Sequence, residues 1–343
     1  MTTDTTPNTV TNKVTNAQPT STQATTMPAV VHALTRAATD ALLIELRHPD
    51  AGARLPEARP GDHVDVRFGR YLRQYSLCSP ATDGRYLICV KRKRDGRGGS
   101  SALHDELRVT DIVQVSAPRS RFPLVRGERT LLLGAGIGIT PLLAMAETLW
   151  HEDATFELWF YAPDRDSAPL IEYIDARSYA DRVHLRLSAQ GQSARTALPD
   201  ELDHPVPDAH IYVCGPPGFM EHVRARARKA GWPDERVHQE TFTVDAEASA
   251  ALSEGDEFAI RVASSGETYR VPSGSSIADV LQANGVDVDL SCEQGICGAC
   301  LVPVLTGIPD HRDEMLSEAE RAANDRMTIC CSRARTAELT LDL

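Results

Sequence analysis

Three cysteines in one short loop constrain the fold of this 343-residue chain more than any other feature. Cys292, Cys297 and Cys300 have the spacing C-x4-C-x2-C, and a further cysteine, Cys330, follows well downstream. Plant-type ferredoxins hold a 2Fe–2S cluster with this spacing, because three thiolates from a tight loop fix one side and a distant thiolate closes the other. The sequence therefore predicts a 2Fe–2S centre with a small ferredoxin-like unit around it.

The alternatives to this ligand set are a zinc site, structural free cysteines and a different fourth ligand. Zinc ribbons usually combine two C-x2-C knuckles, and this chain has one. Cys331 directly follows Cys330, so the spacing alone leaves both as the fourth ligand. Gly295 and Gly298 favour the cluster, since they allow the backbone to fold close to inorganic sulfide and to donate amide hydrogen bonds to it.

Length, charge and composition restrict the class of protein. A chain of 343 residues is expected to form two or three domains, and 42% hydrophobic with 24% charged residues is typical of a soluble globular protein. The net charge of −12 argues against a nucleic-acid partner and suits an electron carrier that meets protein partners through charged patches. No apolar run reaches the roughly 18 residues that a membrane span requires, so no membrane association is expected.

The N-terminal tail, residues 1–27, is rich in threonine and nearly devoid of apolar residues, so we expect disorder there. It has neither the basic start nor the apolar centre of a secretory signal, which favours a cytoplasmic location. Thiols stay reduced in that compartment, so the eight cysteines are expected to be ligands or thiols rather than disulfides.

Patterns of apolar residues predict a multidomain chain. Residues 28–125 contain short apolar runs separated by turn signals, which predicts an antiparallel β-barrel. Residues 126–243 alternate strand and helix patterns, which predicts an α/β domain with a parallel sheet. Residues 244–256 are small, polar and acidic, and predict a linker. Residues 257–343 predict a compact α+β module, the β-grasp domain of plant-type ferredoxins.

A glycine-rich turn joins a buried strand to a helix in the α/β part. Gly134, Gly136 and Gly138 permit a tight turn. The helix that follows, with Thr140 and Pro141 in its first turn, offers N–H groups and a partial positive charge to a pyrophosphate. The turn lacks the G-x-G-x-x-G fingerprint, so a merely structural turn is the alternative.

A second turn of similar kind, Cys214-Gly215-Pro216, ends a later strand of the same part. Ligands of open α/β sheets bind at the carboxyl ends of strands, so the two turns are expected to form one crevice. The alternative interpretation of Cys214 is a thiol buried in the core.

In this order, the segments together resemble the phthalate dioxygenase reductase family, the reductase components of Rieske-type oxygenases and O-demethylases. The sequence R-Q-Y-S-L from Arg73 is similar to its flavin motif R-x-Y-S-L, and residues 96–100 read G-R-G-G-S, like its phosphate loop. The sequences G-x-G-I-G-I-T-P from Gly134 and C-G-P from Cys214 are similar to nucleotide segments of the wider ferredoxin reductase superfamily. The cysteine loop lies at the C-terminus, as in the family.

The resemblance implies FMN in the barrel, with FAD as the alternative. By analogy, Arg73 and the amides of the glycine loop neutralise the flavin phosphate, Tyr75 packs against the ribityl chain or ring, and Ser76 hydrogen-bonds near N5. The residues implied to bind the flavin are Arg73, Tyr75, Ser76, Val90, Lys91, Gly98, Gly99, Ser100 and Phe242. The resemblance also favours Cys330 over Cys331 as the fourth cluster ligand.

For the nucleotide, the resemblance implies NADH or NADPH, and Asp164 favours NADH. Relatives often have A-R-S at 162–164, whereas this chain places a carboxylate there, which can accept hydrogen bonds from ribose hydroxyls and repel a 2′-phosphate. The neighbouring cation Arg165 argues against this preference for NADH. The residues implied to bind the nucleotide are Gly134, Gly136, Ile137, Gly138, Thr140, Pro141, Asp164, Cys214, Gly215, Pro216 and Met220.

The expected activity is NADH-dependent electron transfer, in which hydride passes to FMN and single electrons leave through the cluster to a terminal oxygenase, a Rieske-type enzyme by preference. Ser76, Thr140 and Cys214 are the expected catalytic-site residues. Alternatives are the same reductase serving a haem or other monooxygenase, and a non-enzymatic ferredoxin-type carrier or redox sensor. An acidic run either docks a basic partner or is a solvated face; it comprises Asp310, Asp313, Glu314, Glu318 and Glu320.

Overall fold

The first unit is an antiparallel barrel. The computed structural model describes residues 26–80, 83–94, 98–242 and 254–343. The barrel strands pair in the order β4-β3-β6-β1-β2-β5, with β7 beside β3, and a bridge between Leu77 and Ile88 closes the sheet. Its elements are β1 (Thr26–Ala38), β2 (Ala41–Arg47), β3 (Asp62–Phe68), β4 (Tyr71–Ser76), β5 (Arg85–Lys91), α1 (Gly99–Asp105), β6 (Ile112–Ser116) and β7 (Arg119–Ser120).

The second unit, called the α/β unit below, is a parallel sheet in the order β10-β9-β8-β11-β12. Side chains of successive strand residues point to opposite faces, so Leu132 packs in the core on the α2 side and Leu131 and Leu133 in the core on the α4 side. Its elements are β8 (Arg129–Ala135), α2 (Ile139–His151), β9 (Phe156–Ala162), α3 (Ile171–Asp175), β10 (Val183–Leu187), β11 (Ala209–Cys214), α4 (Pro217–Ala230) and β12 (Val237–Glu240).

The third unit, called the ferredoxin unit below, has the sheet order β14-β13-β19-β15-β17, and β13 and β19 pair in parallel. Ser276 and Asp279 form a capping box at the start of α6, whose Ile277 and Leu281 pack in the core. Its elements are β13 (Phe258–Val262), β14 (Thr268–Val271), α6 (Ile277–Ala283), β15 (Leu301–Thr306), β16 (Pro309–Asp310), α7 (Glu318–Ala323), β17 (Arg326–Thr328), β18 (Arg333–Ala334) and β19 (Glu338–Leu341).

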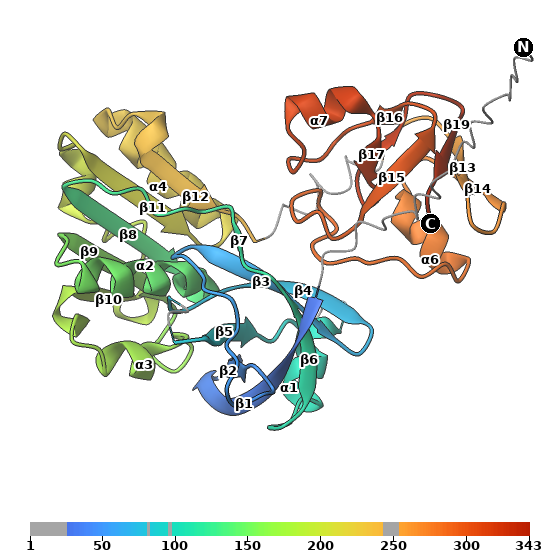
Figure 1. The fold of residues 1–343 in the computed structure, drawn as a ribbon. Coiled ribbons are helices and arrows are strands. Elements are labelled where there is room, and N and C mark those ends of the chain that lie inside the picture. The colour runs from blue at the N-terminus through green and yellow to red at the C-terminus, as the bar shows by residue number, and fades with distance from the viewer. Residues whose placement is uncertain (1–25, 81–82, 95–97, 243–253) are drawn as a thin grey trace, which may run out of the picture.

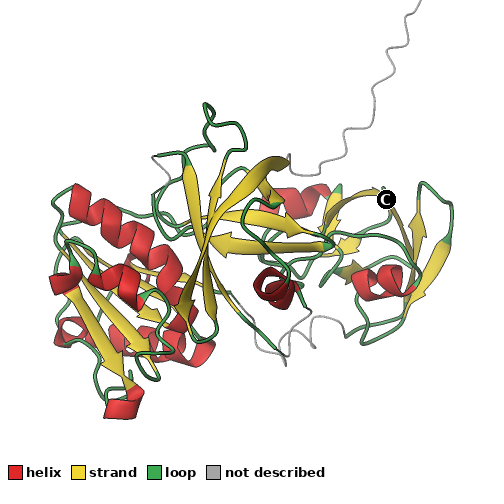
Figure 2. Ribbon diagram, turned by 90° about the horizontal axis from the view of Figure 1, so that it is seen from below, coloured by secondary structure: helices red, strands yellow, loops and turns green. Residues whose placement is uncertain are grey.

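The barrel lies between the other two units (Figures 1 and 2). Backbone N–H groups join it to the α/β unit, from Thr39 to the Asp166 carbonyl at 3.0 Å and from Leu170 to the Ala37 carbonyl at 2.9 Å. On the other side, Arg67 pairs with Asp289 of the ferredoxin unit at 2.6 Å. No helix in the described part of the chain is long and apolar enough to cross a membrane.

The three architectures are those predicted, whereas the exact domain bounds remain predictions. Strand β1 already begins at Thr26, within the segment expected to be a disordered tail. The rest of that tail and most of the predicted linker 244–256 lie outside the described residues, as does the first part of the G-R-G-G-S loop, residues 96–97.

Candidate functional site

A cavity of about 420 Å³ lies where the three units meet. This volume is within the range of small-molecule and cofactor sites. The barrel contributes His63, Arg73, Gln74, Tyr75, Ser76, Cys89, Lys91 and Arg121, the α/β unit Ile137, Thr140 and Gln239–Phe242, and the ferredoxin unit Ser291, Cys292, Ile296 and Glu314. Predicted flavin, nucleotide and cluster residues therefore share one cavity.

The two strands of the β3–β4 hairpin place His63 beside Ser76 in the wall of this cavity. Burial, followed by the charges of Arg119 and Arg121, lowers the pKa of His63 to about 3, so its ring is neutral. Its Nε2 atom is buried without a hydrogen-bond partner among the described residues. A buried polar atom without a partner is costly, which fits a cavity that takes a polar ligand.

The Ser76 hydroxyl donates a hydrogen bond to Glu240 Oε2 at 3.2 Å. Glu240 ends β12, directly beside Cys214 at the end of β11. Burial raises the pKa of Glu240 to about 7, against the opposing effects of Ser76 and Arg121. The α/β unit thus brings a partly buried carboxylate into contact with the residue predicted to lie near flavin N5.

The glycine loop lies against Arg73, as a phosphate site requires. A Cβ atom on Gly99 would lie 2.9 Å from Arg73 Nε, and one on Gly98 would lie 2.8 Å from the Tyr71 hydroxyl. Gly98 also has φ +81°, which favours glycine. This close approach of bare backbone to a guanidinium fits a bound phosphate group, so the residues present suit a flavin mononucleotide.

The two Gly-rich turns of the α/β unit pack against each other. A Cβ atom on Gly138 would lie 2.3 Å from the Cys214 carbonyl oxygen, and one on Gly215 would lie 2.9 Å from the Ala135 Cβ. Gly136 has φ +54° and open space beside it. The turns therefore form the single crevice expected at the carboxyl ends of β8 and β11, which suits a nucleotide pyrophosphate.

Other predicted cofactor residues divide into cavity-facing and buried ones. Thr140 lines the cavity with Ile137, to whose carbonyl its hydroxyl donates at 3.0 Å. Lys91 and Phe242 also line it, and Tyr75 does so with a pKa raised by burial. The predicted residues that are instead buried in a core are Val90, Pro141, Cys214 and Met220. Pro216 and Asp164 are exposed. The Ser100 hydroxyl accepts a hydrogen bond from the Lys93 N–H at 3.0 Å.

The cysteine loop surrounds its own sulfur atoms with backbone donors. The N–H groups of Gln294 and Cys297 donate to the Cys292 sulfur at 3.3 Å, and those of Cys292 and Ala299 donate to the Cys297 sulfur at 3.4 Å. The Cys297 thiol lowers the pKa of Cys292, and the N–H groups of Gln294 and Cys297 lower it further. Such donors stabilise thiolate ligands of iron, so the loop fits a 2Fe–2S cluster.

The four predicted ligands stand in two pairs, since Cys292 contacts Cys297 and Cys330 contacts Cys300. Cys330 also contacts its neighbour Cys331. Within the described ranges, no three His, Cys, Asp or Glu side chains converge on a site for one metal ion. Two pairs of thiols suit two irons, each with two protein ligands.

The Cys331 sulfur contacts the Cys330 thiol and otherwise lies in a buried polar network. It lies 3.2 Å from the Thr328 hydroxyl and 3.9 Å from that of Ser332. A Cβ atom on Gly295, whose φ is +73°, would lie 2.6 Å from this sulfur, so the loop passes directly over Cys331. This placement favours Cys330 as the fourth ligand.

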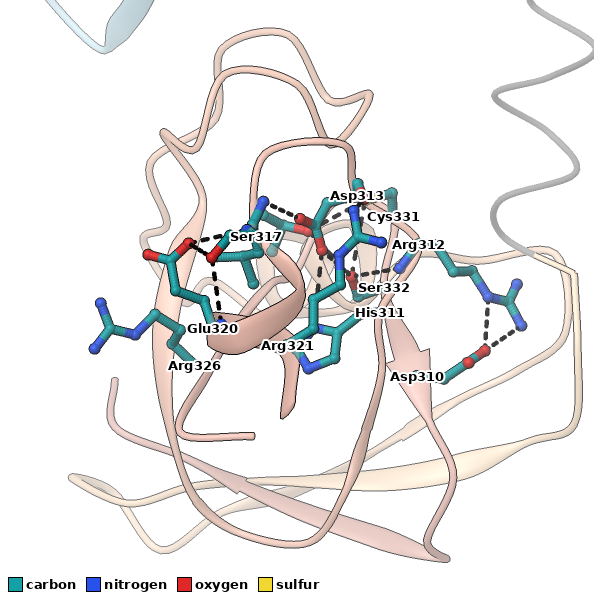
Figure 3. A network of polar contacts seen from close by, with 12 residues as sticks. Asp310, His311, Arg312, Asp313, Ser317, Glu320, Arg321, Arg326, Cys331 and Ser332 are labelled. Carbon is teal, nitrogen blue, oxygen red and sulfur yellow. Dashed lines mark hydrogen bonds and ion pairs between the residues drawn. The ribbon is translucent and has the colours of Figure 1, made fainter. Parts of the chain in front are cut away.

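The acidic run of the ferredoxin unit is largely engaged in internal contacts (Figure 3). Asp313 is buried and accepts a backbone N–H at 2.7 Å. Glu320 accepts the N–H of Ser317 at 2.9 Å in the capping box of α7. Asp310 pairs with Arg312 at 2.8 Å. These carboxylates stabilise the fold locally, which favours a structural role over docking of a basic partner.

Known proteins resemble this chain over almost its whole length. The 2Fe-2S iron-sulfur cluster binding domain matches residues 260–335, and the oxidoreductase NAD-binding domain matches residues 132–225. A vanillate O-demethylase oxidoreductase from a Pseudomonas species (strain HR199) is 42% identical, covering 89% of this chain and 96% of that protein. The phthalate dioxygenase reductase structure covers 93% of this chain and 98% of that one, with 33% identity and a TM-score of 0.68. The chain belongs to the phthalate dioxygenase reductase family.

This reductase is an NADH-dependent oxidoreductase that uses FMN and a 2Fe–2S cluster to supply electrons to a terminal oxygenase. The predicted fold class, activity and cofactors are thereby confirmed. Part of a self-sufficient cytochrome P450 monooxygenase is also similar, with 34% identity and a TM-score of 0.71 over 93% of this chain and 41% of that one.

Sequence reasoning missed several residues of the reductase cavity, above all His63, Glu240 and Arg121. A signal for His63 existed, because the two-residue turn after Phe68 fixes the hairpin register that pairs His63 with Ser76. Glu240 could have been found as a carboxylate at the carboxyl end of a strand. Nothing in the sequence singles out Arg121.

Proposed function

We propose that this reductase supplies electrons to a Rieske-type oxygenase that demethylates or hydroxylates an aromatic acid. The observation that carries the proposal is the shared cavity, in which the predicted flavin residue Ser76, the nucleotide residue Thr140 and the cluster ligand Cys292 line one space. Electron transfer slows steeply with distance, so a cluster ligand in the wall of the flavin cavity gives a direct exit. The relatives named for vanillate and phthalate support the choice of acceptor.

In this proposal, each group of residues has a distinct task. Arg73 with Gly98 and Gly99 holds the flavin phosphate, and Ser76 with its partner Glu240 orients the flavin at the reacting edge. Bound FMN supplies the conversion between two-electron hydride chemistry and one-electron transfer to the cluster.

The nucleotide-binding residues hold the dinucleotide along the edge of the sheet. The turn from Gly134 to Thr140 receives the pyrophosphate, and Asp164 at the end of β9 accepts hydrogen bonds from the adenosine ribose. Thr140 and the turn that begins at Cys214, whose thiol is buried in the core, position the nicotinamide. Cys292, Cys297, Cys300 and Cys330 ligate the cluster.

The test combines the purified holoprotein with an aromatic-acid O-demethylase oxygenase of the Rieske type. NADH consumption coupled to the demethylated product is expected, and no coupling with Rieske oxygenases of several aromatic acids would overturn the proposal. The reductase itself is checked first by its flavin and iron–sulfur absorbance, so that an inactive preparation is not mistaken for a wrong partner.

A second acceptor is suggested by the self-sufficient cytochrome P450, in which a similar reductase part shares a chain with a haem monooxygenase. A haem monooxygenase belongs in the same assay. Coupled turnover with it, in the absence of turnover with any Rieske oxygenase, would favour this second function.

A further inference from the structure

Three arginines of the barrel lie near the cavity, and two of them have fixed partners. Arg119 pairs with the buried Asp65 at 2.6 Å. Arg73 donates to the Leu72 carbonyl at 2.7 Å and to the Leu290 carbonyl at 3.1 Å. The third, Arg121, is an exposed side chain that lines the cavity and has no hydrogen-bond or ion-pair partner among the residues that the structure describes. Its charge is therefore uncompensated by a direct contact.

Arg121 lies within electrostatic range of both sides of the electron path. On the flavin side, its charge lowers the pKa of Glu240, the partner of Ser76, against the larger effect of burial. On the cluster side, Arg121 lines the same cavity as Cys292, within electrostatic range of Cys292 and Cys297. Burial lowers the pKa of Arg121, yet a guanidinium keeps its charge at neutral pH because its ordinary pKa is above about 12.

We propose that Arg121 is an electrostatic positioning residue that favours the electron on the cluster. The step is a one-electron transfer, in which the flavin loses one electron and the cluster gains one electron and one negative charge, and no bond forms or breaks. A cation in the wall of this cavity stabilises that added charge, and the potential of an iron–sulfur cluster rises with such charge. The inference rests on the proposed assignment of the cluster to the four cysteines.

The alternative is that Arg121 only supports the structure. The two roles differ in what a neutral replacement changes. A structural role predicts loss of cluster or flavin content, whereas an electrostatic role predicts an intact cluster with a shifted midpoint potential. A lysine should then largely restore the potential, because it restores the charge without the guanidinium.

The test is a redox titration of the full-length holoprotein, with the reduced cluster followed by electron paramagnetic resonance. Arg121→Gln and Arg121→Met are compared with Arg121→Lys and with the wild type. Arg126→Gln is the matched control, since it removes the same charge from an exposed side chain that pairs with Glu152 on the α/β unit. Iron, sulfide and flavin contents are measured for every variant.

Both neutral variants are expected to have a more negative cluster potential, and Arg121→Lys and Arg126→Gln are expected to match the wild type closely. A tenfold shift in the electron distribution corresponds to about 59 mV. Unchanged potentials with full cluster content would overturn the proposed role of Arg121 and leave the ligand assignment intact. Loss of the cluster from both neutral variants would also overturn the role of Arg121. A wild-type protein without iron would overturn the ligand assignment instead.

Discussion

At the scale of single residues, the identity of the fourth cluster ligand depends on which of two adjacent thiols faces Cys300. The Cys330 thiol contacts Cys300, whereas the Cys331 sulfur contacts Cys330 and the hydroxyl group of Thr328. Both cysteines lie in a turn in which the Ser332 N–H donates to the Thr328 carbonyl at 3.1 Å, so the path of this turn decides which thiol faces Cys300. Spacing along the chain cannot resolve a choice between neighbours.

Replacement of Cys330 by serine is therefore expected to remove the cluster while NADH still bleaches the flavin. Cys331→Ser is the matched control and should keep the cluster, since its sulfur lies outside the two thiol pairs. Visible absorbance, iron content and anaerobic flavin reduction report the outcome. The reverse pattern, with cluster loss in Cys331→Ser only, would contradict the assignment.

A second prediction at this scale concerns the choice of nucleotide. Asp164 is exposed at the end of β9, where its carboxylate accepts the Ser167 N–H at 2.9 Å. Asp164→Ala removes a charge that repels a 2′-phosphate, so the preference in kcat/KM for NADH over NADPH should fall about tenfold, which is about 1.4 kcal/mol.

Asp181→Ala provides the control for this change. Asp181 is an exposed carboxylate that precedes β10, at the amino-terminal edge of the same sheet, away from the nucleotide crevice. Its replacement should leave the preference unchanged. Equal preferences in all three proteins would exclude Asp164 as the discriminating residue.

At the scale of elements, the crevice depends on how closely the turns after β8 and β11 approach. Gly138 needs no unusual φ, but a side chain there would collide with the Cys214 carbonyl. The glycine is thus required by contact between two elements rather than by its own turn.

Gly138→Ala is expected to separate these turns, with a loss of about 1–3 kcal/mol in stability and weaker NADH binding. Gly218→Ala is the matched control, because a Cβ atom there meets nothing within 4 Å and alanine favours the helix α4. Thermal melting and NADH titration compare the two variants. Equal melting temperatures would show that the turns can move apart without cost.

At the scale of the whole molecule, the ferredoxin unit contacts the barrel through few polar bonds. Arg67 pairs with Asp289 at 2.6 Å, and Gln74 donates to the Cys297 carbonyl at 3.3 Å. Both Arg67 and Asp289 are about one-third exposed, so the pair is expected to contribute only about 0.2–1 kcal/mol. Weak docking suits a unit that must also meet an external acceptor.

Asp289→Asn should slow electron transfer from flavin to cluster by about two- to fivefold in stopped-flow measurements at low salt. The difference from the wild type should shrink at high salt, because ions screen the pair. Glu257→Gln is the control, since it breaks an exposed pair with Arg270 on the same unit. Rates that do not differ at low salt would exclude the Arg67–Asp289 pair from docking.

The sequence by itself determined the local chemistry of this reductase. Cysteine spacing, turn glycines and apolar periods are short-range properties, so they identified the barrel and the parallel sheet and predicted the cluster loop and the phosphate-binding segments. Tertiary structure alone decided which side chains meet, because those contacts join residues far apart in the chain. Ser76 with Glu240, Arg121 beside the cysteine loop, and Cys330 rather than Cys331 facing Cys300 all depend on the packing of the three units.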